Sequence, residues 1–354
     1  MTTLRWCVLA RASLALFAGT AAAATSARAQ DSTDRPVRIF ESQEIVALML
    51  TADLRTLTRD RDSTDARYHP AVVRYSGTGE APVTIAAEAR TRGIWRRARR
   101  NCSFPPLRIN FESDSVKGTA FRGQRAVKLV THCRDDGRYE QYVLQEYLMY
   151  RIYNLLSPHG FRARLARVTY ADAGDGGSDT HYGILLEDDD EMAQRYDGEI
   201  LDVMGGAFAD LDPDAMALTG AFLYMIGNTD WSVAGLHNMV LLGIPGRMPI
   251  AVPYDFDFAG AVDAHYATAD PRVGISSVRE RAYRGNCRTL AQWAPIVARF
   301  NEQRQAIHAL YDSVPSLERR NAQRARSYFD EFYETINDAG SLRRAFIEPC
   351  REGA

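Results

Sequence analysis

Residues 126–158 have the sequence AVKLVTHCRDDGRYEQYVLQEYLMYRIYNLLSP, in which a short apolar segment is followed by a long amphipathic one. The first five residues predict a strand, with Lys128 at its centre. Between 139 and 156 apolar residues recur at helical spacing, and Ser157-Pro158 ends the run. This passage from strand to helix predicts a fold that mixes both kinds of element.

The segments around this junction have the character of strands. Upstream runs rich in branched and aromatic residues predict strands at 71–75, 83–85 and 107–111. Downstream, 166–170 and 182–186 predict two more, which a Gly- and Asp-rich turn separates. We therefore expect the N-terminal half of the chain to be mostly β.

The C-terminal half is predicted to be helical. Asp212-Pro213 marks a helix start, and an apolar run continues until Gly227. Two further helices are predicted at 290–314 and 317–336.

This order of elements predicts an α+β fold of two lobes. Residues 30–187 form a β-rich N-lobe with one helix, and residues 188–354 form an α-rich C-lobe of the same domain. A cleft between two such lobes is where a ligand is expected to bind.

Residues 1–29 are predicted to be an export signal. Arg5 gives a positive start, an almost uniformly apolar or small stretch follows, and Ala27-Arg28-Ala29 offers a cleavage site. An uncleaved membrane anchor is the alternative, although the apolar stretch is short for a span. Beyond this segment the sequence has no stretch that is long and apolar enough to cross a bilayer. The working protein is therefore predicted to be secreted or periplasmic.

The charge of the chain argues against nucleic acid as a partner. Residues 1–29 contain three arginines and no acidic residue, so their removal changes the formal net charge from −2 to −5. A chain with an acidic balance has no general attraction for nucleic acid.

Export makes the cysteines that follow the signal informative. These are Cys102, Cys133, Cys287 and Cys350. Four cysteines allow three pairings, and proximity in sequence favours Cys102 with Cys133 and Cys287 with Cys350. A zinc site is disfavoured because the chain has no C-x-x-C pair and no matching histidine spacing.

A dense set of polar residues follows the helix that Gly227 ends. Asp230 lies in the loop GNTDW, Asn238 precedes an apolar strand, and Asp255 and Asp257 lie in the later segment PYDFDF. Phosphoryl transfer needs one carboxylate at the acceptor hydroxyl, and an amide oxygen with a second carboxylate to hold a divalent metal on the phosphates. Asp230 is assigned the first role and Asn238 and Asp255 the metal, with Asp257 as a further metal ligand or orienting group. The alternative is a helix end with surface acids, followed by outward-facing strand residues.

These motifs resemble the CotH spore-coat kinase family of the kinase-like superfamily. The likeness includes the GNTDW loop before an asparagine, the later D-x-D, and RTRG at 90–93, which resembles the R-x-R-G segment of the family. It covers roughly residues 37–258. The resemblance implies a kinase-like fold, ATP as the phosphoryl donor and Mg²⁺ or Mn²⁺ as the cofactor.

The resemblance also implies residues on the phosphate side of the site. Lys128 is similar to the strand lysine that contacts nucleotide phosphates, Glu146 on the following helix is its expected partner, and Arg92 is expected to bind phosphate. Glu140 is the other candidate partner for the lysine. A strand lysine also fits a solvated position, and the arginine-rich segment 90–100 also fits a solvated face or a site for another acidic polymer.

Several features depart from the family pattern or lie outside it. Asp230 and Asn238 are eight positions apart, whereas the protein-kinase loop separates the two residue types by five. A glycine-rich G-x-G-x-x-G segment is missing from the sequence. The acidic run 187–191 is interpreted as a solvated turn, and the histidines at 132, 181 and 237 as structural residues.

Taken together, these observations predict a secreted kinase-like phosphotransferase. It would move the terminal phosphoryl group of ATP to a hydroxyl on a protein or cell-surface glycan. The alternative is a catalytically inactive protein of the same fold that binds or assembles in the cell envelope.

Overall fold

The structure, a computed structural model, describes residues 37–62, 66–76, 82–174 and 176–350. The export signal predicted at 1–29 lies outside the described residues. The part of the chain from Val37 onward forms one compact unit.

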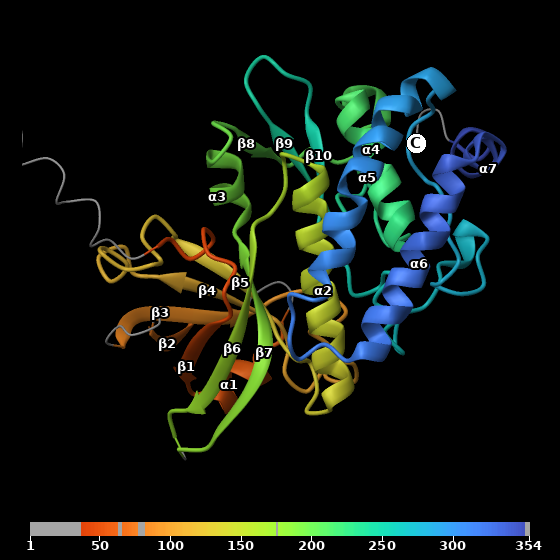
Figure 1. The fold of residues 1–354 in the computed structure, drawn as a ribbon. Helices are drawn as coiled ribbons and strands as arrows, with labels where there is room; N and C mark the ends of the chain where they lie inside the picture. The colour runs from red at the N-terminus through yellow and green to blue at the C-terminus, as the bar shows by residue number, and fades with distance from the viewer. Residues whose placement is uncertain (1–36, 63–65, 77–81, 175, 351–354) are drawn as a thin grey trace, which may run out of the picture. The chain divides into compact units, whose positions relative to one another are not determined.

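Seven strands close into a barrel (Figure 1). They are β1 (Val46–Ala52), β2 (His69–Ser76), β3 (Val83–Thr91), β4 (Leu107–Phe111), β5 (Ala126–Val130), β6 (Ala163–Asp172) and β7 (Ser178–Glu187), in the order β1-β2-β3-β4-β5-β7-β6. Neighbouring strands are antiparallel except β1 and β6, which run parallel with Val46 opposite Ala166 and close the barrel. Buried apolar residues that alternate along the strands, such as Leu50, Val73 and Ile85, fill its interior.

The rest of the described chain contains the α-helices and a second small sheet, joined by loops and short helical turns. The helices are α1 (Leu54–Arg59), α2 (Gly137–Leu156), α3 (Asp189–Gln194), α4 (Pro213–Ile226), α5 (Leu290–Leu310), α6 (Arg319–Asn337) and α7 (Ala339–Leu342). The second sheet has the order β10-β9-β8, with β8 at Glu199–Leu201, β9 at Met239–Gly243 and β10 at Ile250–Pro253. Figure 1 shows α2 beside the barrel strands β6 and β7, and it also packs against α4 and α5. None of the helices in the described ranges combines the length and apolar character that a membrane span needs.

The predicted fold, an α+β arrangement of two kinase-like lobes, is wrong. The N-terminal strands form a closed barrel instead of an open β-rich lobe, the predicted lobe 30–187 contains the helix α1 as well as α2, and the region 188–354 contains the three strands of the second sheet. The strand β1 was not predicted, and its parallel pairing with β6 joins segments more than a hundred residues apart. Short-range periodicity carries no signal of such a pairing.

Several local predictions are confirmed. The strands predicted at 107–111 and 126–130 are β4 and β5 with the same bounds. The side chain of Asp212 caps the start of α4, and Gly227 ends it in the left-handed conformation at φ 68°. The helix α2 ends at Ser157, as the Ser-Pro pair predicts.

Three residues of the acidic run 187–191 are buried, Glu187, Asp188 and Glu191, so the interpretation of the run as a solvated turn is wrong for them, whereas Asp190 is exposed. Glu187 is fully buried and pairs with Arg162 at 2.9 Å and Arg195 at 2.7 Å. Glu191 accepts a hydrogen bond from Ala126 N at 3.1 Å, and burial raises its pKa to about 7. These acids connect α3 to the barrel.

Two disulfides join the pairs that sequence proximity favours. Cys102 is bonded to Cys133, and Cys287 is bonded to Cys350. The first links the segment before β4 to the residues that lead into α2, and the second ties the C-terminal segment to the residues before α5. Bonds of this kind persist in oxidising compartments.

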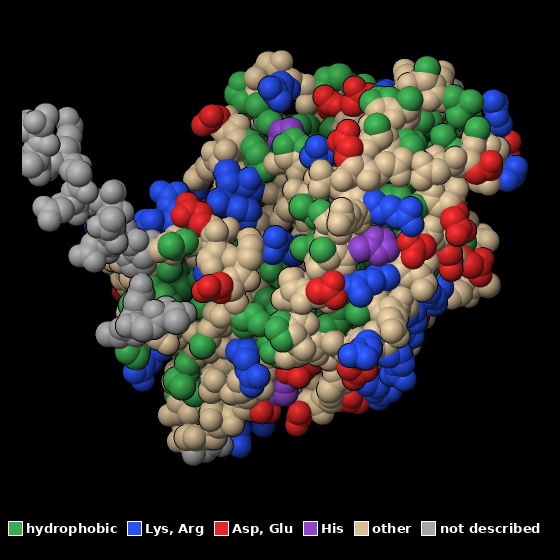
Figure 2. Space-filling view, viewed as in Figure 1, with side chains coloured by type: hydrophobic (Ala, Val, Ile, Leu, Met, Phe, Trp, Pro, Cys, Tyr) green, Lys and Arg blue, Asp and Glu red, His purple; other side chains and the backbone are tan. Residues whose placement is uncertain are grey.

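Acidic and basic side chains lie interspersed on the face shown in Figure 2. The helices α5 and α6 carry both signs, and Arg304 of α5 pairs with Asp330 of α6 at 2.8 Å. A surface on which both signs are mixed has no general attraction for polyanions.

Candidate functional site

Asp230, Asn238 and Asp255 lie together where the loop after α4 meets the β9–β10 hairpin. Asn238 Nδ2 donates to Asp230 O at 2.8 Å and to Asp230 Oδ2 at 3.1 Å. At the end of the hairpin, Tyr254 N–H donates to Asn238 O at 3.1 Å. Asp255 is the next residue, and its charge acts on His237, which lies against Asp230. The structure thus places in one region the three residues to which the sequence assigns the chemistry.

Asn238 and Asp255 both have left-handed backbone conformations. Their φ angles are 52° and 61°. Asn and Asp adopt this region more readily than other residues with a Cβ, but at some cost in free energy. Such conformations concentrate at active and binding sites, where the surrounding structure holds them.

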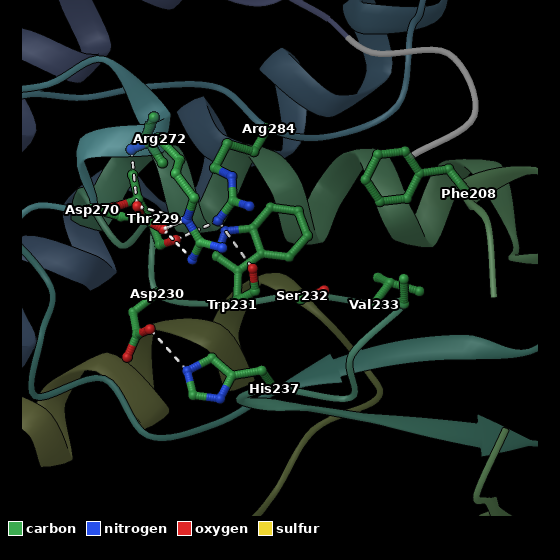
Figure 3. A pocket seen from close by; sticks show the side chains of 12 residues that line it. Phe208, Thr229, Asp230, Trp231, Ser232, Val233, His237, Asp270, Arg272 and Arg284 are labelled. Carbon is green, nitrogen blue, oxygen red and sulfur yellow. Dashed lines mark hydrogen bonds and ion pairs between the residues drawn. The ribbon is translucent and has the colours of Figure 1, made fainter. Parts of the chain in front are cut away.

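A cavity of about 360 Å³ lies beside Asp230 (Figure 3). His237 Nε2 is 2.8 Å from Asp230 Oδ1, and the side chains are 46% and 41% exposed. On another wall of the cavity, the Arg284 guanidinium lies over the Trp231 ring, 5.2 Å from its centroid. Asp230 therefore borders a space large enough to admit part of an acceptor molecule.

The contact between His237 and Asp230 makes a testable prediction. The hydrogen bond that the Asp230 carboxylate accepts from His237 raises the pKa of His237 above the ordinary histidine value. We expect an NMR titration of the ring protons to show this, and Asp230→Asn to lower the midpoint. His308, whose pKa burial lowers, is the internal control and should not move. Equal His237 midpoints in the two proteins would contradict the contact.

A second group of charges surrounds the buried Arg96, whose side chain is 7% exposed. The guanidinium lies 3.2 Å from Glu146 of α2 and 3.5 Å from Asp257, and it also pairs with Asp255. Tyr266 OH donates to Asp257 Oδ2 at 3.1 Å. One buried cation thus joins three carboxyl groups.

The three carboxyl groups differ in their tendency to ionise. Burial raises the pKa of Asp257 well above its usual value and raises the pKa of Glu146, in spite of the Arg96 charge. Burial would raise the pKa of Asp255 too, but the positive charges of Arg96 and Arg92 outweigh this effect, so the pKa of Asp255 is lowered. The Asp255 side chain is 31% exposed. Asp255 is therefore the ionised member of the group that solvent and ligands can reach.

The donor atoms of Asn238 and Asp255 fit a divalent cation. Because Asn238 Nδ2 is committed to Asp230, its Oδ1 is the atom left to act as a ligand, and Asp255 offers an ionised carboxylate. Mg²⁺ and Mn²⁺ prefer such oxygen ligands. Asp257, predicted as a further metal ligand or orienting group, has its carboxyl buried against Arg96 and Tyr266, a position that suits the orienting role better.

Lys128 has a different partner from the one predicted. Its ammonium group pairs with Asp189 of α3, whereas Glu146 pairs with Arg96. The lysine side chain is 4% exposed, and its Nζ lies 4.6 Å from the centroid of Phe161 and 5.4 Å from that of Tyr254. Burial lowers the pKa of Lys128, against the charge of Asp189. Tyr254, whose ring this ammonium group faces, is the residue before Asp255 in the sequence.

Arg92 follows β3 and lies close enough to Lys128 and Asp255 for its charge to affect both. Its charge lowers the pKa of Lys128 and of Asp255. Among the residues that the structure describes, its side chain has no direct hydrogen bond or ion pair. Arg92 therefore lies near the exposed carboxylate of Asp255 and also near the ammonium group of Lys128.

His237 and Arg96 are the site residues that the sequence interpretation missed. His237 lies seven positions after Asp230, across a short loop that an isolated bridge between Ser232 and His237 closes. A short polar loop that returns on itself brings its two ends together, so the sequence could have indicated His237 as a neighbour of Asp230. The sequence gives no such indication for Arg96, because it does not distinguish this arginine from the others in 90–100.

No family model matches this chain, and no curated protein matches it. The resemblance to the CotH family stays a prediction that the quoted motifs carry.

Proposed function

We propose that this protein is a secreted or periplasmic phosphotransferase, which moves the terminal phosphoryl group of ATP to a hydroxyl of a protein or glycan acceptor. The observation that carries the proposal is the hydrogen-bonded pair of Asp230 and Asn238 beside the ionised Asp255. The two disulfides are compatible with the location.

Asp230 is the group that would receive the proton of the acceptor hydroxyl. His237 lies against its Oδ1 and Asn238 donates to its Oδ2, so the carboxylate is held in one orientation at the edge of the cavity. A fixed carboxylate next to an open space meets the geometric requirement for a general base. The acceptor would enter through the cavity that Trp231 and Arg284 line.

Arg92 and Lys128 would bind the phosphates of the donor. Arg92 lies near both Asp255 and Lys128, and burial next to Asp189 keeps the Lys128 side chain in one place. Asn238 and Asp255 would hold Mg²⁺ or Mn²⁺, which when bound neutralises charge on phosphate oxygens. Arg96 would orient Asp255 and keep it ionised.

A thermal-shift measurement tests the donor side. At about a hundred times the dissociation constant, a ligand stabilises the folded state by about 2.7 kcal/mol. We therefore expect ATP with Mn²⁺ to raise the melting temperature by several degrees, and Asp255→Asn to remove the shift. The matched control is Asp257→Asn, which also deprives Arg96 of a carboxylate but should keep the shift. Equal shifts in melting temperature for the two variants would contradict the assignment of Asp255 as the metal ligand.

Transfer itself is tested with ATP labelled on the terminal phosphate. Incubation with Mn²⁺ and a cell-envelope fraction should move label from ATP to a macromolecular acceptor, and Asp255→Asn should stop it. The proposal would be overturned if label were transferred neither to an acceptor in any fraction nor to the protein itself.

A second candidate is a protein of the cell envelope that binds its ligand without catalysis. Two ion pairs favour it, because they already occupy groups assigned to the nucleotide and the metal: Asp189 pairs with Lys128, and Arg96 pairs with Asp255. A nucleotide-induced shift in melting temperature without any transfer of label would support this candidate.

A further inference from the structure

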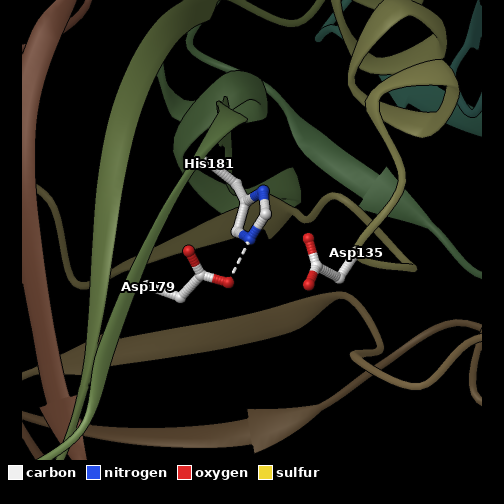
Figure 4. A group of neighbouring side chains, drawn as sticks. All are labelled: Asp135, Asp179 and His181. Atoms are coloured by element: carbon white, nitrogen blue, oxygen red, sulfur yellow. Dashed lines mark hydrogen bonds and ion pairs between the residues drawn. The ribbon is translucent and has the colours of Figure 1, made fainter.

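Asp135, Asp179 and His181 form a compact cluster outside the site described above. Each offers one potential metal ligand, and these three atoms lie within 4.8 Å of one another. Asp179 and His181 are two positions apart on β7, so they lie on the same face of the strand. Asp135 comes from the segment just before α2. Figure 4 shows the carboxylates of both aspartates facing the His181 ring.

The His181 ring is oriented by a carboxylate on its other side. His181 Nδ1 lies 3.3 Å from Glu140 Oε1 of α2, which also accepts a hydrogen bond from Tyr182 N at 3.0 Å. Nε2 is then the nitrogen that faces the cluster, 2.8 Å from Asp179 Oδ2. In metal sites a ligating histidine almost always donates its second N–H to a carboxylate, carbonyl or water.

The Asp135 carboxylate has no cationic partner among the described residues. Its side chain makes no hydrogen bond or ion pair with any other residue in that part of the chain. The neighbouring Asp136 does, because it caps α2 and pairs with Arg138 at 2.9 Å. The carboxylate of Asp135 instead faces that of Asp179. Two facing carboxylates repel each other, and a bound cation would remove this cost.

Next to the cluster lies His132, a buried polar side chain with one ring nitrogen that the described residues do not use. Its ring is 6% exposed and stacks on His181, with centroids 3.7 Å apart. Its Nδ1 is buried without a hydrogen-bond partner among the described residues. The cluster is therefore backed by a buried imidazole whose Nδ1 is not used by the described residues.

We propose that Asp135, Asp179 and His181 bind a zinc ion, with water as the fourth ligand. One imidazole nitrogen and two carboxylates are a donor set that zinc accepts, whereas Mg²⁺ and Ca²⁺ prefer oxygen alone. Around a tetrahedral zinc with bonds of about 2.0–2.1 Å, ligand atoms are about 3.4 Å apart, so side-chain adjustments would suffice. The ion would tie β7 to the start of α2, beside the Cys102–Cys133 disulfide. This site does not depend on the proposed phosphotransferase function.

The test is calorimetric titration with zinc chloride. The whole exported protein is purified without a histidine tag, freed of metal with a chelator, and titrated. We expect one zinc ion per chain at this site and a higher melting temperature in its presence. Asp135→Asn changes an exposed side chain, should leave the fold intact, and should weaken zinc binding at least tenfold. Asp136→Asn is the matched control: it makes the same change one residue away, keeps a good helix cap, and should bind zinc like the wild type.

Further arms separate this site from the one at Asp255. Asp255→Asn should retain zinc binding and its thermal shift, while His181→Gln should lose both. Cobalt(II) in place of zinc should give visible absorption bands of four-coordinate geometry that Asp135→Asn abolishes. Zinc binding of equal strength in wild type and Asp135→Asn, binding lost in Asp255→Asn, or no zinc binding at all would overturn the proposal.

Discussion

Replacing Asp230 by asparagine should lower the rate constant of phosphoryl transfer by about 10²–10⁴-fold, the range that a positioned general base contributes. The amide keeps the size of the side chain and can still accept a hydrogen bond from Asn238, but it cannot take up the proton of the acceptor hydroxyl. The donor side, with Asp255, Arg92 and Lys128, is unchanged. We therefore expect kcat to fall while the nucleotide-induced shift in melting temperature stays as in the wild type.

Asp214→Asn is the control for this prediction. Asp214 is an exposed residue in the first turn of α4, the helix whose far end leads to Asp230, and it pairs with Arg288. The same change from aspartate to asparagine at the start of α4 should leave kcat within about twofold of the wild-type value, as expected for surface substitutions of small energetic effect. Full activity of the Asp230→Asn variant would show that Asp230 does not act as the base. Loss of nucleotide binding in that variant would assign it to the donor side instead.

The parts of the site that the sequence predicts are those that local chain geometry determines. Asp212-Pro213 and Gly227 set the ends of α4, and the loop after Gly227 has to carry Asp230 away from a buried helix. Asn238 and Asp255 flank two consecutive apolar strands, and the ends of an antiparallel pair meet. A short loop and one hairpin therefore suffice to bring these residues together. The cysteine pairs are predictable for a related reason, since each joins segments close in sequence.

The parts that the sequence did not predict depend on contacts between distant segments. Closure of the barrel needs β1 beside β6, and all five residues of β5 are buried, so alternation along it says nothing about the direction of Lys128. Which acid pairs with Lys128 and which with Arg96 is decided by how α3 and α2 pack on the barrel. His181 did have a local signal, because Asp179 and His181 share one face of a strand.

The network around Arg96 follows from the same packing and governs the stability of the protein as well as its site. Among the residues that the structure describes, Arg96 is the guanidinium in direct contact with Glu146, Asp255 and Asp257, and these side chains come from three segments that are distant in sequence. Taking one partner out of a buried ionic group leaves the others without compensation, which costs more than the group contributes as a whole.

Arg96→Met should lower the free energy of unfolding by about 3–5 kcal/mol, the cost of leaving buried charge uncompensated. The loss should depend on pH. Burial already raises the pKa of Glu146 and Asp257 in the folded state, and the raised values rise further when the cation is removed. A group with a raised folded-state pKa contributes stability below its unfolded pKa and loses that contribution as pH rises through the folded value. The deficit of the variant should therefore be larger at pH 8 than at pH 5.

Urea unfolding of wild type and variant at the two pH values measures this difference. Arg100→Met, which makes the same change at an exposed arginine of the same segment, should cost no more than about 0.5 kcal/mol at either pH. Adding Glu146→Gln to Arg96→Met should recover part of the loss, because it removes one of the carboxylates left without a cation. A deficit that stays the same from pH 5 to pH 8, or one that Arg100→Met reproduces, would mean that Arg96 supports the fold through its bulk and not through its charge.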